Sequence, residues 1–205
     1  APSTPILQEK GLFRIIMTMG EMTAEKWLMA GAAVATIAFL AVAVLQPSLF
    51  DADPDWGVSE GCIGGQTSHT AGEDIGIKFH YHPNLKVIVD GQQLSIEPNT
   101  GIDQIGCREG MRWVHVHSSS ETGYTTLHVE TPSKMNVPLG AFFEIWEREG
   151  GPALTDDREF DINRNGISDW DEFGISMRVD GEINDKFEEY IMEDLDNIEL
   201  EFTSK

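Results

Sequence analysis

An uncharged stretch from Trp27 to Leu45 divides the chain into two unequal parts. As a helix, it is long enough to cross the roughly 30 Å hydrocarbon core of a bilayer. Trp27 at its beginning suits an anchor in the membrane interface. We therefore predict a single transmembrane helix over residues 27–46, preceded by a cytoplasmic or interfacial segment, 1–26. A cleaved signal peptide is the competing interpretation, which the length of the apolar run and the extended N-terminal region disfavour.

The residues around this stretch predict its orientation and its surroundings. Three basic residues precede it and three aspartates follow it: Lys10, Arg14 and Lys26, then Asp51, Asp53 and Asp55. Basic residues stay on the cytoplasmic side, so the C-terminal part is expected outside the cytoplasm. Small residues at 30–33 would let another helix approach closely, and residues 12–22 have the spacing of a short amphipathic helix. We expect membrane lipid and other membrane-protein subunits as partners.

The chain is strongly acidic, with 35 acidic and 14 basic residues and a formal net charge of −21. Binding to nucleic acid requires a basic face, so nucleic acid is excluded as a partner. A well-solvated surface, suited to a saline environment, explains the acidity. A surface that handles cations is the alternative.

Two cysteines, Cys62 and Cys107, both follow the apolar stretch and therefore share a compartment. Outside the cytoplasm a disulfide between them is the expected state, and a pair of thiolate metal ligands is the alternative. Residues 47–74 are rich in Gly, Asp and Ser and are predicted to be a linker, in which His69 is an exposed loop histidine. An irregular lead-in that Cys62 ties down is the alternative.

Residues 75–205 are predicted to form one extracytoplasmic domain. Period-two alternation predicts strands over 77–82, 85–89, 94–96, 111–117, 125–130, 175–179 and 197–202. Asp90-Gly91 and Asp180-Gly181 are hairpin turn signals. Residues 138–147 predict a short helix with one apolar stripe, and 187–192 predict a turn or a short helix. The expected fold class is α+β, mainly antiparallel β with one or two short helices.

Five of the six histidines fall into three short groups: His80 and His82, His115 and His117, and His128. In a strand, residues i and i+2 point to the same face, so each His-x-His directs two imidazoles to one point. Glu130 lies on the same face as His128. If these strands are neighbours, the five rings and Glu130 form a copper or zinc site. The alternative is that the histidines form hydrogen bonds to the backbone or to water.

Residues 161–172 have the ligand spacing of an EF-hand-type calcium loop. Oxygen ligands are predicted from six positions: the side chains of Asp161, Asn163, Asn165, Asp169 and Glu172, and the carbonyl of Ile167. Gly166 permits the sharp turn. No helix is predicted before Asp161, so the loop resembles the isolated, structural calcium loops of dockerins and thrombospondin type 3 repeats. An acidic turn without an ion is the alternative.

An ordered set of motifs also resembles a known family. The matching residues are His80, His82, Pro83, Asp90, Gly91, Pro98, Gly101, Ile102, His115, His117, His128, Glu130, Pro132, 139–146, the Val179-Asp180-Gly181 hairpin and 194–202. Over residues 75–205 the chain is similar to small, often membrane-anchored extracytoplasmic proteins of ammonia-oxidising archaea and some bacteria. The resemblance implies a fold and a metal site. Members carry His-Thr-His-Asp where this chain has His115-Val116-His117-Ser118, and the loop at 161–172 is an insertion.

These observations predict a function without intrinsic catalysis. No Ser/His/Asp order, phosphate loop or nucleotide fingerprint occurs in the sequence. We expect a membrane-anchored accessory subunit of a membrane complex, with a histidine-rich metal site and a structural calcium loop. The resemblance implies a copper-dependent ammonia monooxygenase as that complex. An independent copper-binding or copper-delivery protein is the alternative, and a metalloenzyme is the third hypothesis.

Overall fold

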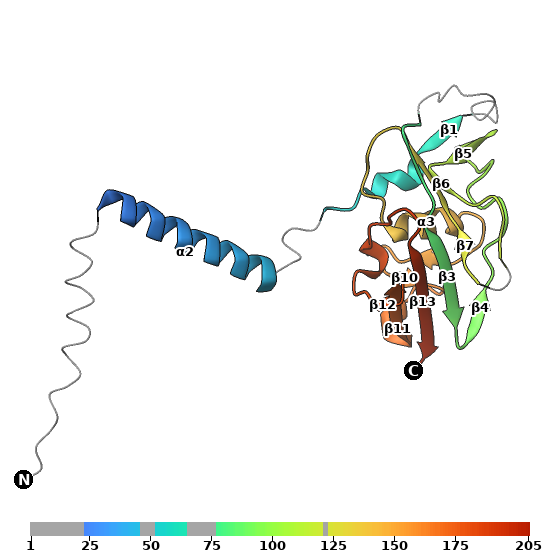
Figure 1. The fold of residues 1–205 in the computed structure, drawn as a ribbon. Coiled ribbons are helices and arrows are strands. Elements are labelled where there is room, and N and C mark those ends of the chain that lie inside the picture. Colours follow the sequence, from blue (N-terminus) through green and yellow to red (C-terminus); the bar gives the residue numbers. More distant parts are fainter. Residues whose placement is uncertain (1–22, 46–51, 65–76, 121–122) are drawn as a thin grey trace, which may run out of the picture. The chain divides into compact units, whose positions relative to one another are not determined.

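Two separate units make up the chain, and they divide between Asp51 and Ala52. The computed structural model describes residues 23–45, 52–64, 77–120 and 123–205 (Figure 1). The amphipathic segment predicted at 12–22 and the loop histidine His69 lie outside the described residues.

The first unit contains the helix α2, Ala24–Leu45. Its 22 residues rise about 33 Å, which is long enough to cross a membrane. Large apolar side chains are exposed all around it, among them Leu28, Met29 and Ile37. A helix that is apolar on every side needs a lipid or protein surrounding to cover it. The described residues therefore contain one helix that could span a membrane, as the sequence predicts.

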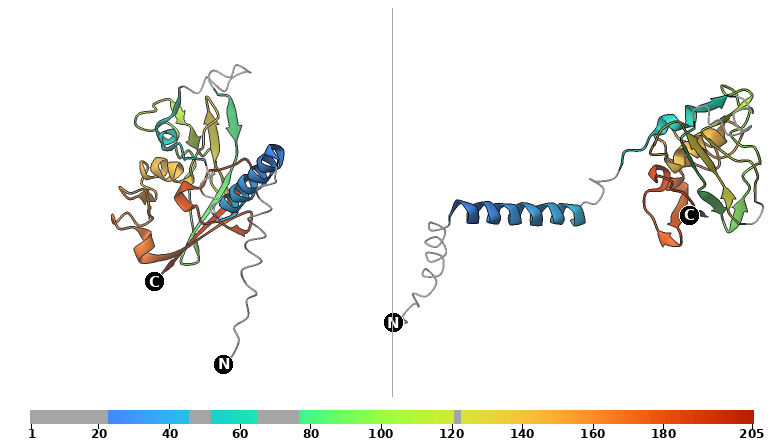
Figure 2. Two further views of the ribbon diagram at one scale, coloured as in Figure 1. Left: turned by 90° about the vertical axis from the view of Figure 1, so that its left-hand side faces the viewer. Right: turned by 45° about the horizontal axis from the view of Figure 1, so that its top comes forward.

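The second unit is built mainly from antiparallel strands (Figures 1 and 2). Its largest sheet has the order β12-β11-β13-β3-β4, and β7 also pairs with β3. The bounds are β3 Asn84–Val89, β4 Gln92–Leu94, β7 Thr125–Thr126, β11 Phe173–Val179, β12 Glu182–Ile183 and β13 Asn197–Ser204. The hairpins β3–β4 and β11–β12 turn at Asp90-Gly91 and Asp180-Gly181, where all four residues have positive φ. The pairing of β3 with β13 is parallel.

A smaller sheet of three strands has the order β2-β8-β6. Its strands are β2 Phe79–Tyr81, β8 His128–Thr131 and β6 Val114–His115. Two further antiparallel pairs complete the unit: β1 Cys62–Gly64 with β5 Gly110–Arg112, and β9 Ala153–Leu154 with β10 Phe160–Asp161. This unit therefore agrees with the predicted mainly antiparallel α+β class.

Two predicted strands are divided between different sheets. The strand predicted at 111–117 breaks at Trp113, because β5 pairs with β1 whereas β6 pairs with β8. The strand predicted at 125–130 breaks at Leu127, because β7 pairs with β3 whereas β8 pairs with β2 and β6. The alternating pattern is continuous in both segments, so a change of partner strand leaves no signal in it.

The core lies around the helix α3, Leu139–Glu147. Its predicted apolar stripe is buried, and so are Gly140, Ala141 and Ile145, so that only Glu144 and Glu147 remain partly exposed. The helix is therefore enclosed on nearly all sides rather than amphipathic. Aromatic rings pack from α3 through Phe160 to Phe202 of β13, with centroids 4.8 Å apart from Phe143 to Phe160 and 5.5 Å from Phe160 to Phe202.

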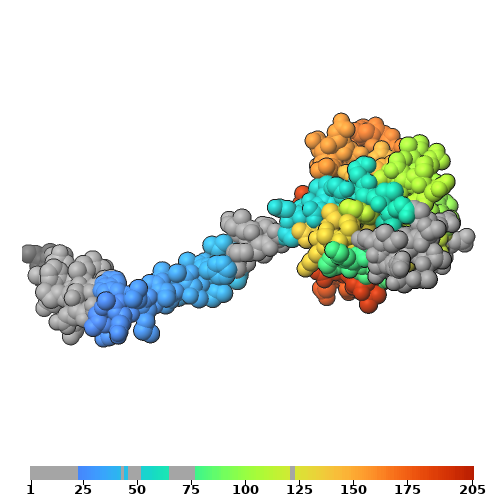
Figure 3. Space-filling model, turned by 90° about the horizontal axis from the view of Figure 1, so that it is seen from above, coloured from blue at the N-terminus to red at the C-terminus, as the bar shows by residue number. Residues whose placement is uncertain are grey.

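The prediction of a linker over residues 47–74 is wrong for residues 52–64. These residues form the 3-10 helix η2, Trp56–Glu60, and the strand β1, and the space-filling view shows them (cyan) as part of the domain surface (Figure 3). Val58 is completely buried in the core. Gly61 lies so close to Trp113 that a Cβ there would be 1.9 Å from the indole ring. The segment is ordered by these contacts, which a Gly- and Ser-rich composition does not reveal.

Two short helices complete the unit. The 3-10 helix η4, Phe187–Glu189, lies within the segment predicted as a turn or short helix. The helix α4, Asp169–Glu172, immediately precedes β11 and is capped by the Ser168 hydroxyl, which accepts from Trp170 N.

Candidate metal centres

The strand register places four of the predicted metal-binding residues on one face of the β2-β8-β6 sheet. His80 lies opposite Glu130, and His115 lies opposite His128. Directly paired residues in antiparallel strands project to the same side, and so do residues two apart. Tyr81, Val114 and Val129 alternate with them and face the core. His82 and His117 follow the ends of β2 and β6. We call these five histidines and Glu130 the histidine face.

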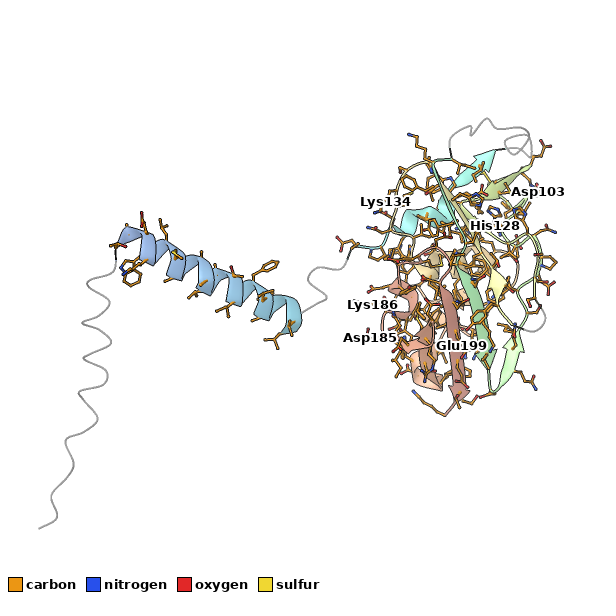
Figure 4. All side chains as sticks on the ribbon, viewed as in Figure 1. Asp103, His128, Lys134, Asp185, Lys186 and Glu199 are labelled. Atoms are coloured by element: carbon orange, nitrogen blue, oxygen red, sulfur yellow. A yellow bond between two sulfur atoms is a disulfide. The ribbon has the colours of Figure 1, made fainter. Side chains whose placement is uncertain are left out.

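The imidazoles gather in two groups of three, and the groups share His128. The first group is His80, His82 and His128, and the second is His115, His117 and His128. Within each group, one nitrogen from each ring lies within 4.8 Å of the others. His80 Nε2 is 3.4 Å from His128 Nδ1, and His115 Nε2 is 3.2 Å from His117 Nε2. The sequence predicts one converging face, whereas the structure arranges the five rings in two groups (Figure 4 labels His128).

His115 is completely buried, and its hydrogen bonds determine which of its nitrogens can bind a metal. Its Nδ1 lies 2.9 Å from the carbonyl oxygen of Arg112. A carbonyl oxygen only accepts, so Nδ1 carries the hydrogen and donates it. In the neutral ring Nε2 then has the lone pair, and Nε2 faces His117. This arrangement is usual for histidine ligands, whose second nitrogen donates to a fixed acceptor.

Two carboxylates lie beside the first group. Glu130 is 1% exposed, and its Oε1 is 3.3 Å from His80 Nε2. Asp194 accepts a hydrogen bond from His82 N at 2.8 Å, and the same oxygen is 3.9 Å from His82 Nδ1. Negative charge here favours a bound cation. The spacing to His128 predicts Glu130 on this face, whereas no local pattern predicts Asp194, whose acidic surroundings at 193–196 resemble any solvated turn.

Further positioning residues of the histidine face were also missed. Gly101 has a φ of +86° and lies against His115. The buried Arg112 holds the loop at 104–105 and Glu60 through its guanidinium, while its carbonyl fixes His115. An arginine at the end of a short strand carries no local signal for this role.

The acidic loop, residues 161–172, is folded around its own side-chain oxygens. β10 enters it and α4 leaves it, so no helix precedes Asp161 among the described residues. Asp161 accepts from Asn165 N at 3.0 Å and from Gly166 N at 2.9 Å. Asn165 Oδ1 accepts from Ile167 N at 2.7 Å. Gly166 has a φ of +79°, which allows the sharp turn that the sequence predicts.

Glu172 closes the acidic loop from the opposite side. Its Oε2 accepts from Asn163 Nδ2 at 3.0 Å and from Asn165 Nδ2 at 2.8 Å. The two amides and the carboxylate therefore lie within reach of one another. Rotation of each amide by half a turn would present oxygen in place of nitrogen to the same region.

Asp169 has the most unusual environment in the acidic loop. It is completely buried, its Oδ2 accepts from Ile162 N at 2.7 Å, and its Oδ1 is buried with no hydrogen-bond partner. Burial, and then the charges of Asp161 and Glu172, raise the pKa of Asp169 to about 6. A buried carboxylate oxygen without a donor is costly unless a cation balances it.

The two cysteines form a disulfide between Cys62 and Cys107, 45 residues apart in sequence. The bond ties β1 to the turn before β5. Neither sulfur is a thiolate, so the alternative of thiolate metal ligands does not apply to this structure.

Comparison of the chain with models of known protein families, with curated proteins and with solved structures found no match.

Proposed function

We propose that the domain from residue 52 onward is a metal-binding module, carried on a membrane by α2, that holds copper or zinc at the histidine face. The observation that carries this proposal is the spacing of the ring nitrogens. Two nitrogens bound to one tetrahedral ion at 2.0–2.1 Å lie about 3.3–3.4 Å apart. The His80–His128 and His115–His117 pairs have separations of 3.4 and 3.2 Å.

Hydrogen bonding explains the grouping of the imidazoles on the histidine face less well than metal binding does. A pair of neutral imidazoles at this distance can share one proton. Three ring nitrogens within 4.8 Å of one another cannot all be satisfied by one proton, whereas one ion can accept all three lone pairs. Protonation of every ring would place several positive charges within a few ångströms of each other, which is also unfavourable.

The ligand set favours copper first and zinc second. Imidazole binds both, and for the same nitrogen ligands Cu²⁺ binds more tightly than Zn²⁺. The disulfide leaves no thiolate among the described residues, so a copper–thiolate electron-transfer centre is not part of the proposal.

The physiological role that we propose is that of an accessory subunit of a membrane complex. It rests on the exposed apolar surface of α2 and on the resemblance to the proteins of ammonia oxidisers, whose copper-dependent monooxygenase is the proposed complex. Purification from native membranes in a mild detergent tests this role, and a chain that migrates alone would contradict it. An independent copper-delivery protein is the second candidate, supported by the exposed His80 and His117.

Metal analysis tests the histidine face directly. The full chain in detergent, loaded with Cu²⁺ and desalted, is expected to retain copper, and His80→Ala/His117→Ala, which removes one exposed ligand from each group, is expected to lose it. Lys86→Ala/Glu199→Ala is the matched control, because it removes an ion pair between β3 and β13 that is not part of the histidine face (Figure 4 labels Glu199). Equal copper content in the histidine variant and the control would reject the proposal.

We further propose that the acidic loop binds Ca²⁺ as a structural ion. The buried Oδ1 of Asp169, which has no donor, is the observation that favours this. Calcium accepts six to eight oxygens, and the loop supplies them from Asp161, Asn163, Asn165, Asp169, Glu172 and the Ile167 carbonyl.

Thermal unfolding of the full chain tests the calcium proposal. Millimolar Ca²⁺ is expected to raise the Tm more than Mg²⁺ does, and Glu172→Gln is expected to abolish the difference. Asp171→Asn is the control, because Asp171 is an exposed carboxylate in the same helix that is not a predicted ligand. A Tm that does not respond to Ca²⁺ would reject the proposal.

A further inference from the structure

The histidine face contains two groups of three imidazoles rather than one group of five. His80 and His82 belong to one group, His115 and His117 to the other, and His128 alone belongs to both. One ion at 2.0–2.1 Å from each ligand can serve either group with small side-chain rotations. The grouping therefore raises the question of how many ions the face holds.

His128 lies between the two groups. Its ring centroid is 4.7 Å from that of His82 and 4.5 Å from that of His117, and it meets both rings edge to face. Its Nδ1 faces His80 Nε2. The Nε2 of an imidazole lies on the other side of the ring, so the two nitrogens of His128 can serve different ions.

The two groups also differ in chemistry. The first has carboxylates beside it, with Glu130 Oε1 3.3 Å from His80 Nε2 and Asp194 Oδ1 3.9 Å from His82 Nδ1. The second has a buried histidine, His115, whose Nδ1 donates to a backbone carbonyl and whose Nε2 is directed at His117. Each group thus has its own ligand set apart from the ring they share.

We propose that the histidine face binds two metal ions per chain, one in each group, with His128 as the bridging ligand. The inference rests on the proposed metal-binding function and specifies its stoichiometry. A bridging imidazole binds one ion through each nitrogen, so the ring loses its N–H proton to the solvent when the second ion binds. The resulting negative ring and the carboxylates of Glu130 and Asp194 offset the repulsion between the two cations.

The experiment measures the number of copper ions bound per chain and the number of unpaired electron spins that they carry. The full chain in detergent is loaded with Cu²⁺ and desalted, and copper is measured by mass spectrometry. The expected result is two ions per wild-type chain. His80→Ala/His82→Ala and His117→Ala each remove ligands of one group, and each is expected to halve the copper content. His115 is left unchanged because its complete burial makes a folding defect the simplest result of replacing it.

Electron paramagnetic resonance tests the bridge separately. Two Cu²⁺ ions joined by one imidazolate couple magnetically, so the wild-type signal is expected to fall well below two spins per chain. Each half-loaded variant is expected to show one full spin. Circular dichroism confirms that each variant is folded.

The outcomes separate this inference from the function on which it rests. One copper ion in the wild type overturns the inference and leaves the metal-binding function intact. Two ions with two full spins overturn the bridge through His128. No copper in the wild type overturns both the inference and the proposed function.

Discussion

Gly101 lies directly against His115. A Cβ at position 101 would be 2.9 Å from the Cβ of His115 and 2.9 Å from the carbonyl oxygen of Val114. The Gly101 carbonyl accepts from Arg112 N at 2.8 Å and the Thr100 carbonyl accepts from Val116 N at 2.8 Å, so this turn holds the chain on both sides of the buried histidine. The close approach and the φ of +86° both require glycine at this position.

Gly101→Ala is therefore expected to destabilise the domain and to weaken metal binding together. Positive φ costs roughly 1–2 kcal/mol for a residue with a Cβ, and overpacking adds roughly 1–3 kcal/mol. Gly91→Ala is the matched control, because Gly91 also has a positive φ, +76°, but no atom within 4 Å of the added Cβ. Chemical denaturation measures the free energy of unfolding of both variants. Equal losses of stability would show that the contact with His115 is unimportant.

Glu130→Gln is expected to lower copper affinity by roughly 10- to 100-fold while the fold is retained. The substitution keeps the size of the buried side chain and removes the charge beside His80 Nε2. Competition titration against a copper chelator measures the change. Glu199→Gln removes a carboxylate that pairs with Lys86 instead, and an equal loss in that variant would argue for a general electrostatic effect.

Cys62→Ser/Cys107→Ser is expected to reduce the free energy of unfolding by about 2–4 kcal/mol, because the unfolded chain gains entropy when the cross-link is removed. The double substitution removes the cross-link between β1 and the turn before β5. Thermal unfolding with and without a reductant measures the effect. The reductant should lower the Tm of the wild type and leave that of the variant unchanged.

The stability of the domain is expected to depend on pH through the buried carboxyl of Glu188. It is buried, its Oε1 accepts from Phe160 N at 2.9 Å, and burial raises the pKa of Glu188 above its ordinary value. A carboxyl whose folded pKa is raised contributes stability below its unfolded pKa of about 4.3, and this contribution is lost as the pH rises through the folded pKa.

Glu188→Gln keeps the acceptor and removes the titration. The variant is expected to be more stable than the wild type near pH 7, and the advantage should disappear as the pH falls toward 4. Unfolding free energies measured across this range test the sign. A wild type that gains stability over the variant as the pH rises would contradict the assignment.

Local patterns in the sequence were sufficient to predict several features of the structure. The apolar run predicted α2, the Asp-Gly pairs predicted both hairpin turns, and Gly166 predicted the sharp turn of the acidic loop. Period-two spacing also placed the histidines of each pair on one side. These features depend on backbone geometry within a few residues, which the sequence specifies directly.

Pairing between distant segments could not be predicted in the same way. The breaks at Trp113 and Leu127, the parallel pairing of β3 with β13 and the ordered lead-in at 52–64 each arise from contacts between segments far apart in the chain. Asp194 and His82 are 112 residues apart in sequence but are joined by a hydrogen bond in the fold. In the sequence alone, Asp194 cannot be distinguished from an ordinary surface aspartate.

The sequence by itself determined which residue types can hold a metal and which local geometry presents them. Only the tertiary structure decided how they are grouped, because the sheet register puts His128 between the two histidine pairs and Glu130 beside His80. Ligand chemistry is a property of single side chains and short spacings. The number and composition of the histidine groups depend on which strands become neighbours.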